Sequence, residues 1–196
     1  MVHPLPPAEE LSVPFLIAVS VVALAEIGDK TQLLSILLAA RYRKPWPIVA
    51  GMTLATLLNH GAAAALGQLV QSYLTPDVLR WVLGVSFLAV AVWTLVPDTM
   101  DDEEKSAYRH GPFLATLVLF FLAQIGDKTQ VATIMLAARY KSLVMVVSAT
   151  TLGMLIANVP VVWLGAKASE RLPLRTIRLA AAGLFAALGL YALVFG

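Results

Sequence analysis

The amino-acid sequence predicts an all-α, polytopic transmembrane protein with six helices arranged as two inverted three-helix repeats. Three observations lead to this fold class. Apolar residues make up 59% of the 196 residues and charged residues only 13%, whereas soluble domains carry about 25% charged residues. Six apolar runs are each long enough to cross a bilayer. One polar motif occurs twice, in the first run and again in the fourth.

Each apolar run is bounded by charged residues or proline. In chain order the predicted spans are Val13–Ala40, Pro47–Leu74, Val78–Val96, Phe113–Ala138, Leu143–Gly165 and Ile177–Phe195. They are apolar on all sides and do not alternate with a period of two, which excludes the strands of a barrel. The first run has 28 residues, about 42 Å of helix against a hydrocarbon core of about 30 Å, so it must tilt or break.

The repeated motif defines the domain organisation. Glu26-Ile-Gly-Asp-Lys-Thr-Gln32 returns as Gln124-Ile-Gly-Asp-Lys-Thr-Gln130, and 12 of 18 positions are identical between Glu26–Arg43 and Gln124–Lys141. The sequence therefore divides into a first three-helix repeat (1–96), an acidic cytoplasmic linker (97–112) and a second three-helix repeat (113–196). Because three is odd, the second repeat enters the membrane from the opposite side, which predicts inverted repeats.

Both motifs fall at the midpoints of their runs and therefore at the bilayer centre. An ionisable side chain costs about 2.5–3.5 kcal/mol there, so two Asp-Lys pairs are hard to explain by structure alone. Helical spacing predicts that Glu26, Asp29 and Gln32 share one face and that Gln124, Asp127 and Gln130 share its counterpart. A glycine in each motif, Gly28 and Gly126, permits close helix approach or local unwinding.

The oxygen-bearing side chains of the motifs are the candidate metal ligands. They are Glu26, Asp29, Gln124 and Asp127, with further candidates for ligands or a proton path at Gln32, Gln130, Asn59, His60 and Asn158, and with Lys30 and Lys128 balancing the charge. An oxygen set without cysteine suits hard divalent cations such as Mn²⁺, Ca²⁺ or Mg²⁺.

Structural roles remain open for several of these residues. Each Asp-Lys pair could neutralise itself and hold helices in register. The side chains of Gln32 and Gln130 could serve as interhelical hydrogen-bonding groups. His60 could be a hydrogen-bonded core residue rather than a proton shuttle. Thr31 and Thr129 are expected to hydrogen-bond to helix carbonyls.

Lys and Arg outside the motifs set the predicted orientation. Nine lie on one face (Arg41, Arg43, Lys44, Lys105, Arg109, Lys167, Arg171, Arg175, Arg178) and three on the other (Arg80, Arg139, Lys141). The linker is therefore expected in the cytoplasm, with both termini outside. The start of the chain carries Glu9 and Glu10 and no Lys or Arg before the first run, which is not typical of a signal peptide.

The doubled motif resembles that of the Golgi-type calcium/manganese:proton antiporter family (the GDT-one type), which occurs in bacteria, chloroplasts and the Golgi. The resemblance extends from Val13 to Phe195. It implies cation transport, with manganese export as the usual bacterial role, proton exchange as the coupling, and Glu26, Asp29 and Asp127 as metal ligands. The second motif of the family normally begins with Glu, and here it begins with Gln124.

The sequence thus predicts a secondary transporter that exports Mn²⁺ or Ca²⁺ in exchange for protons by alternating access, in the inner membrane of a bacterium. Its expected partners are the metal ion, protons and the lipid bilayer. A net charge of +2 gives no indication of nucleic-acid binding, and no enzymatic activity, cofactor or oligomeric state is predicted. Two alternatives remain at this stage: an exporter of small organic solutes such as amino acids, and an intramembrane aspartyl enzyme.

Overall fold

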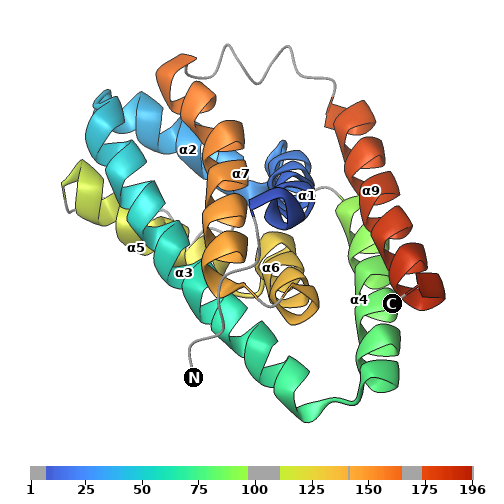
Figure 1. Cartoon of the computed structure of the whole chain (residues 1–196). Coiled ribbons are helices and arrows are strands. Elements are labelled where there is room, and N and C mark those ends of the chain that lie inside the picture. The colour runs from blue at the N-terminus through green and yellow to red at the C-terminus, as the bar shows by residue number, and fades with distance from the viewer. Residues whose placement is uncertain (1–7, 97–110, 141, 165–173, 196) are drawn as a thin grey trace, which may run out of the picture.

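The structure is a computed structural model that describes residues 8–96, 111–140, 142–164 and 174–195. These residues form eight helices and no strand (Figure 1), which confirms the all-α prediction. The helices are α1 (Ala8–Glu26), α2 (Lys30–Tyr42), α3 (Pro45–Tyr73), α4 (Pro76–Thr94), α5 (Pro112–Gln124), α6 (Lys128–Arg139), α7 (Leu143–Leu164) and α9 (Leu174–Phe195). The predicted linker lies outside the described residues apart from Gly111 and Pro112.

The predicted membrane spans coincide with single helices or with bent helix pairs. Within the described residues, α3, α4, α7 and α9 are each long and apolar enough to cross a membrane. The pairs α1–α2 and α5–α6 bend by 67° and 69°, so each is either one broken span or a re-entrant segment, and the total is four to six spans. These pairs fall on the predicted runs Val13–Ala40 and Phe113–Ala138. The long first run therefore breaks.

Two glycines allow long helices to pack closely against the first half of each bent pair. A Cβ added at Gly153 of α7 would lie 2.7 Å from the Val19 carbonyl oxygen of α1. One added at Gly51 of α3 would lie 3.0 Å from the Thr116 Cβ of α5. Small residues at such crossings let helix backbones approach each other, which is how helices associate within a bilayer. Thus α1 packs on α7, and α5 packs on α3.

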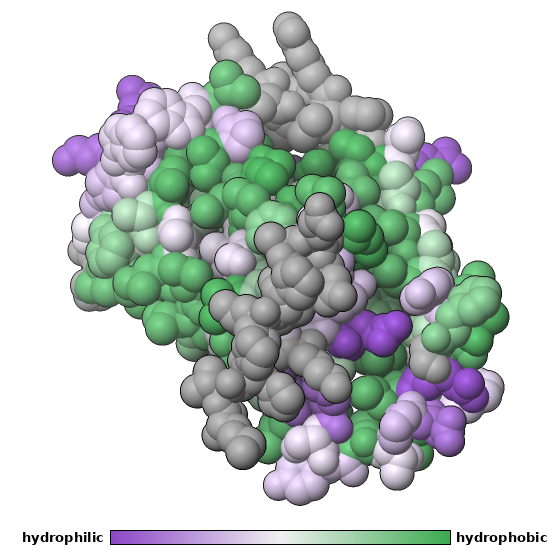
Figure 2. Space-filling model, viewed as in Figure 1, coloured by the Kyte–Doolittle hydropathy of each residue, from purple (hydrophilic) through white to green (hydrophobic). Residues whose placement is uncertain are grey.

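Helices α4 and α9 pack against each other at one side of the molecule (Figure 1). The apolar core consists of two clusters. One contains residues of α1, α4, α6, α7 and α9 and one residue of α3, and includes Val21, Leu136 and Phe185. The other contains residues of α2, α3, α5 and α7, including Leu34 and Phe120. Hydrophobic residues form a broad area on the face shown in Figure 2, as expected for a surface in contact with lipid.

Candidate metal site at the two helix breaks

Each bent pair breaks at the repeated motif. Helix α1 ends at Glu26 and α2 begins at Lys30, with Asp29 as its N-cap. Helix α5 ends at Gln124 and α6 begins at Lys128, with Asp127 as its N-cap. The glycine within each break has a positive φ, 83° at Gly28 and 73° at Gly126, a conformation that side chains with a Cβ rarely adopt. Of the two roles expected for these glycines, close helix approach and local unwinding, the structure shows unwinding.

The break changes the predicted arrangement of the motif side chains. Residues 27–29 and 125–127 lie outside the helices, so the expectation that Glu26, Asp29 and Gln32 form a helical stripe is wrong, as it is for Gln124, Asp127 and Gln130. Side chains three residues apart share a face only where the helix is continuous. The acidic side chains come together through the turn instead.

Gln32 and Gln130 stabilise the two breaks. The Gln32 Oε1 accepts a hydrogen bond from the Gly28 N–H at 2.9 Å, and its Nε2 donates to the Ala157 carbonyl at 3.2 Å. The Gln130 Oε1 accepts from the Gly126 N–H at 2.7 Å, and its Nε2 donates to the Asn59 Oδ1 at 2.9 Å. Both amides thus tie an unwound turn to a long helix, as interhelical hydrogen-bonding groups do.

Three buried carboxylates meet where the breaks face each other. Glu26, Asp29 and Asp127 each offer one oxygen, and these oxygens lie within 4.8 Å of one another. The residues are 0%, 2% and 2% exposed. Several carboxylates at such short range in an apolar interior need positive charge close by, because isolated buried charges are costly.

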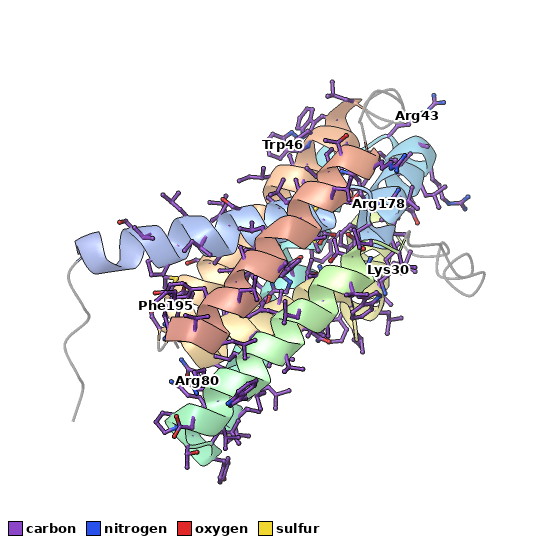
Figure 3. All side chains as sticks on the ribbon, turned by 90° about the vertical axis from the view of Figure 1, so that its right-hand side faces the viewer. Lys30, Arg43, Trp46, Arg80, Arg178 and Phe195 are labelled. Atoms are coloured by element: carbon purple, nitrogen blue, oxygen red, sulfur yellow. The ribbon has the colours of Figure 1, made fainter. Side chains whose placement is uncertain are left out.

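The two motif lysines supply part of that charge, each to the aspartate of the other break. The Lys128 Nζ lies 3.6 Å from the Asp29 Oδ1. The same ammonium donates to the Val96 carbonyl at 3.5 Å and lies 5.9 Å from the centre of the Trp93 ring. Lys30, which is labelled in Figure 3, is partly exposed, and its positive charge acts on Asp127. The Asp-Lys pairs therefore do not simply neutralise their sequence neighbours.

Gln124 occupies the end of α5, as Glu26 occupies the end of α1. It is fully buried, and its Nε2 donates to the Thr56 Oγ1 of α3 at 2.9 Å. The Gln124 Oε1 has no hydrogen-bond partner among the described residues. A buried amide oxygen without a partner costs about 1–3 kcal/mol, and a cation or a water molecule would satisfy it.

Asn158 of α7 contacts the Glu26 carboxylate. Its Nδ2 lies 3.4 Å from the Glu26 Oε1, and its Oδ1 accepts from the Ser35 Oγ of α2 at 2.8 Å. These two contacts link α7 to both halves of the first bent pair. Asn158 thus contacts the carboxylate cluster through Glu26, which places it beside the candidate ligands.

His60 lies outside the carboxylate cluster. Its Nδ1 is 3.0 Å from the Thr150 Oγ1, and that hydroxyl donates to the Val146 carbonyl at 2.8 Å. The Thr150 hydroxyl has one proton, so the Nδ1 is the donor and the neutral ring carries its lone pair on Nε2. The Nε2 is buried and has no hydrogen-bond partner among the described residues.

Sequence reasoning missed the polar side chains that support the site from outside the candidate set. The Thr129 Oγ1 lies 2.9 Å from the Asp127 Oδ2 and its N–H 3.4 Å from the same oxygen, so the expected bond from Thr129 to a helix carbonyl is not the one formed. The Thr31 Oγ1 has no partner among the described residues. Thr56 and Ser35 were detectable only as hydroxyl residues within apolar runs.

The arrangement offers three carboxylate oxygens and an amide oxygen at the junction of two broken helices. Hard divalent cations prefer such oxygen ligands, and broken helices in transporters commonly line ion sites. In an aspartyl enzyme, by contrast, two carboxylates share one proton. An ammonium beside one of them, such as Lys128 beside Asp29, works against that sharing.

Comparison with known proteins gives a consistent result. A family model described as "Divalent cation/proton antiporter GDT1" matches residues 14–102 and 112–196. The chain is 55% identical over 186 residues to a Vibrio cholerae protein named "Putative manganese exporter", covering 94% of this chain and 92% of that protein.

More distant relatives carry the same family name. A rice protein named "GDT1-like protein 4" is 28% identical over 165 residues, covering 71% of this chain and 58% of its own length. A GDT1-like protein of Synechocystis is 28% identical over 141 residues, covering 60% of this chain and 66% of its own length. No solved structure matches the chain significantly.

Proposed function

This chain belongs to the GDT1 family of divalent cation/proton antiporters, and on that premise we propose that it is a secondary transporter that exports Mn²⁺ from the cell in exchange for protons. Ca²⁺ is the second candidate cargo. The observation that carries the proposal is the cluster of Glu26, Asp29 and Asp127 at the two helix breaks. Membership of a transporter family also favours transport over an enzymatic activity.

The spacing of the cluster suits a hard divalent cation. Oxygen ligands lie about 2.3–2.6 Å from Ca²⁺, so two ligands on opposite sides of the ion are at most about 5 Å apart. The three carboxylate oxygens fall within 4.8 Å of one another and fit around one such ion without a large rearrangement. The Gln124 Oε1, which has no partner among the described residues, is the proposed fourth oxygen ligand.

We infer that the ion moves by alternating access between two inverted three-helix repeats, 1–96 and 113–196. Supporting this, α1 packs on α7 as α5 packs on α3, and the two breaks bend by 67° and 69°. The breaks differ in one respect. Lys128 is buried beside Asp29, whereas Lys30 is partly exposed. This difference is expected if the site is accessible from one side only, with the opposite lysine exposed in the alternative state.

Proton coupling depends on groups that can exchange a proton near the metal. The three carboxylates are the proposed exchangeable groups, and His60 is the proposed relay. It lies one helical turn from Thr56, which contacts Gln124, and its Nε2 lone pair is available for a proton. The remaining polar candidates, Asn59 and Asn158, position Gln130 and Glu26.

The proposed location is the inner membrane of a bacterium, with both termini outside. It rests on the excess of Lys and Arg on the face that carries the linker and on the Vibrio relative. Amino-acid export requires a cation for the substrate carboxylate, which Lys30 or Lys128 would have to supply. The geometry favours a metal ion instead, because Lys128 lies 3.6 Å from Asp29 and the charge of Lys30 acts on Asp127.

Transport into liposomes tests the function. Purified protein in vesicles with an internal pH dye should take up Mn²⁺ and release protons, and Asp29→Asn and Asp127→Asn should each abolish both signals. Asp77→Asn is the matched control, because Asp77 is an exposed carboxylate in the first turn of α4. Mn²⁺ flux without any proton movement would contradict the exchange mechanism, and the absence of flux in the unaltered protein would contradict the function.

A further inference from the structure

We propose that the corner where α2 ends, α3 begins and α7 ends binds the phosphate headgroup of an anionic phospholipid. The inference rests on the membrane location of the chain and not on its transport activity. The corner lies at the C-terminal end of α2, away from the carboxylate cluster at the start of that helix.

A pocket of about 410 Å³ opens at this corner. Its apolar wall comes from the last turns of α2 and α7, including Ala40, Val162 and Leu164. Its polar side carries Arg43 and Lys44. Binding pockets for small ligands are commonly about 300–1,000 Å³ and combine apolar walls with a few polar groups.

Among the described residues, the two cations have no acidic partner. Arg43 and Lys44 are exposed and make no ion pair with any described residue. No Asp or Glu occurs between Lys30 and Asp77, and α7 contains no charged residue. Figure 2 shows hydrophilic residues gathered at this corner beside the hydrophobic face. An anion entering the pocket would therefore meet positive charge that no described carboxylate neutralises.

Two tryptophans place the corner at the level of lipid headgroups. The rings of Trp46 and Trp163 lie 5.4 Å apart at 90°, and the residues are 72% and 52% exposed. Exposed tryptophans of membrane proteins gather at the interface, where the indole contacts both acyl chains and water. Trp46 and Arg43 lie toward the same end of the molecule in Figure 3, and Arg80 lies toward the opposite end.

The combination selects a lipid over a soluble phosphate. Basic pockets between transmembrane helices bind anionic lipid headgroups, and each Lys or Arg contributes about a fivefold gain in binding, equivalent to about 1 kcal/mol. The apolar walls and the tryptophans add contacts that only a molecule with acyl chains can use. Inorganic phosphate would meet the same two cations and gain nothing from the rest of the pocket.

Native mass spectrometry of the full chain in detergent tests the proposal. Phosphatidylglycerol should bind in preference to phosphatidylcholine, and the double variant Arg43→Gln/Lys44→Gln should bind it about 25-fold more weakly, at about fivefold per cation. The variant Arg43→Lys/Lys44→Arg keeps the charge and should retain binding. Arg80→Gln, at the opposite end of the molecule, should not change it.

Two results would overturn the assignment. Equal phosphatidylglycerol binding by the unaltered protein and the charge-removed double variant would show that this corner is not the site. Competition by inorganic phosphate at millimolar concentration that displaces the lipid completely would show a simple anion site. If the double variant fails to fold, the single variants replace it. Weaker binding by both Arg43→Gln and Lys44→Gln, with unchanged binding by Arg80→Gln, would support the site, and unchanged binding by both single variants would overturn it.

Discussion

At the scale of single residues, Gln124 is the motif position at which the two breaks differ in charge. Glu26, Asp29 and Asp127 contribute −3, and Lys30 and Lys128 contribute +2, so the motif side chains sum to −1. A glutamate at 124 would make the sum −2, which one divalent cation or two protons would neutralise equally. Glutamine keeps the shape and an oxygen but cannot take up a proton.

We predict that Gln124→Glu raises proton-coupled Mn²⁺ transport. Because one more carboxylate must lose its proton to bind metal, the apparent Mn²⁺ affinity of the variant should fall more steeply as the pH falls, by up to a further tenfold per pH unit. Metal flux and Mn²⁺ affinity at several pH values, compared between the two forms, measure this. Equal rates with equal pH dependence would show that position 124 is outside the proton pathway.

Lys128 leads to a second residue-scale prediction. Lys128→Gln removes the ammonium 3.6 Å from Asp29, and breaking a buried ion pair costs about 3–5 kcal/mol. The variant should therefore melt at a lower temperature without metal, yet bind Mn²⁺ more tightly and gain more stability from it. Lys30→Gln, at a partly exposed position, should have a smaller effect. Weaker Mn²⁺ binding by Lys128→Gln would contradict competition between the lysine and the metal.

At the scale of elements, the helix breaks were predictable and their internal geometry was not. Excess length in the run Val13–Ala40 and a glycine at its midpoint indicated a tilt or a break. The helical stripe of Glu26, Asp29 and Gln32 was wrong because it assumed the continuous helix that the same glycine interrupts. The glutamine hydrogen bonds to the glycine N–H groups depend on the left-handed turn and follow only from the structure.

A glycine substitution tests the breaks. Gly126→Ala should destabilise the protein by about 1–2 kcal/mol and weaken metal binding, because its φ is 73° although a Cβ there would meet no atom within 4 Å. Gly183→Ala is the control. That glycine lies within α9 with equal space around it, and alanine is expected to be neutral or stabilising there. Thermal melts and Mn²⁺ titrations compare them, and equal behaviour would contradict a required left-handed turn.

At the scale of the whole molecule, the sequence predicts the spans well and their tertiary pairing poorly. Hydropathy runs matched single helices or bent pairs because burial in lipid constrains composition along each span. The pairing of Lys128 with Asp29, and of Gln124 with Thr56, joins residues from different halves of the chain. No local pattern encodes such contacts, so Thr56 had no signal that marked it as part of the site, and the repeated motif marked Thr129 without indicating its contact with Asp127.

Alternating access predicts opposite changes on the two sides of the site. Ser35 and Thr133 occupy equivalent positions of the two repeats and are fully buried, and the hydroxyl oxygen of each lies within 3.0 Å of the carbonyl oxygen four residues earlier. In this cysteine-free chain, Ser35→Cys and Thr133→Cys should change their reactivity with a water-soluble maleimide in opposite directions when Mn²⁺ is added. Identical metal-independent labelling at both positions would argue against the mechanism.

The central claim is that both helix breaks contribute carboxylates to one metal site, and Mn²⁺ binding at equilibrium tests it most directly. Electron paramagnetic resonance of free Mn²⁺, titrated with purified protein, should give one bound ion per chain. Asp29→Ala and Asp127→Ala should each abolish that binding while the protein remains folded by circular dichroism, and Asp77→Ala should leave it intact. Unchanged Mn²⁺ affinity in both site variants would contradict a site shared by the two breaks.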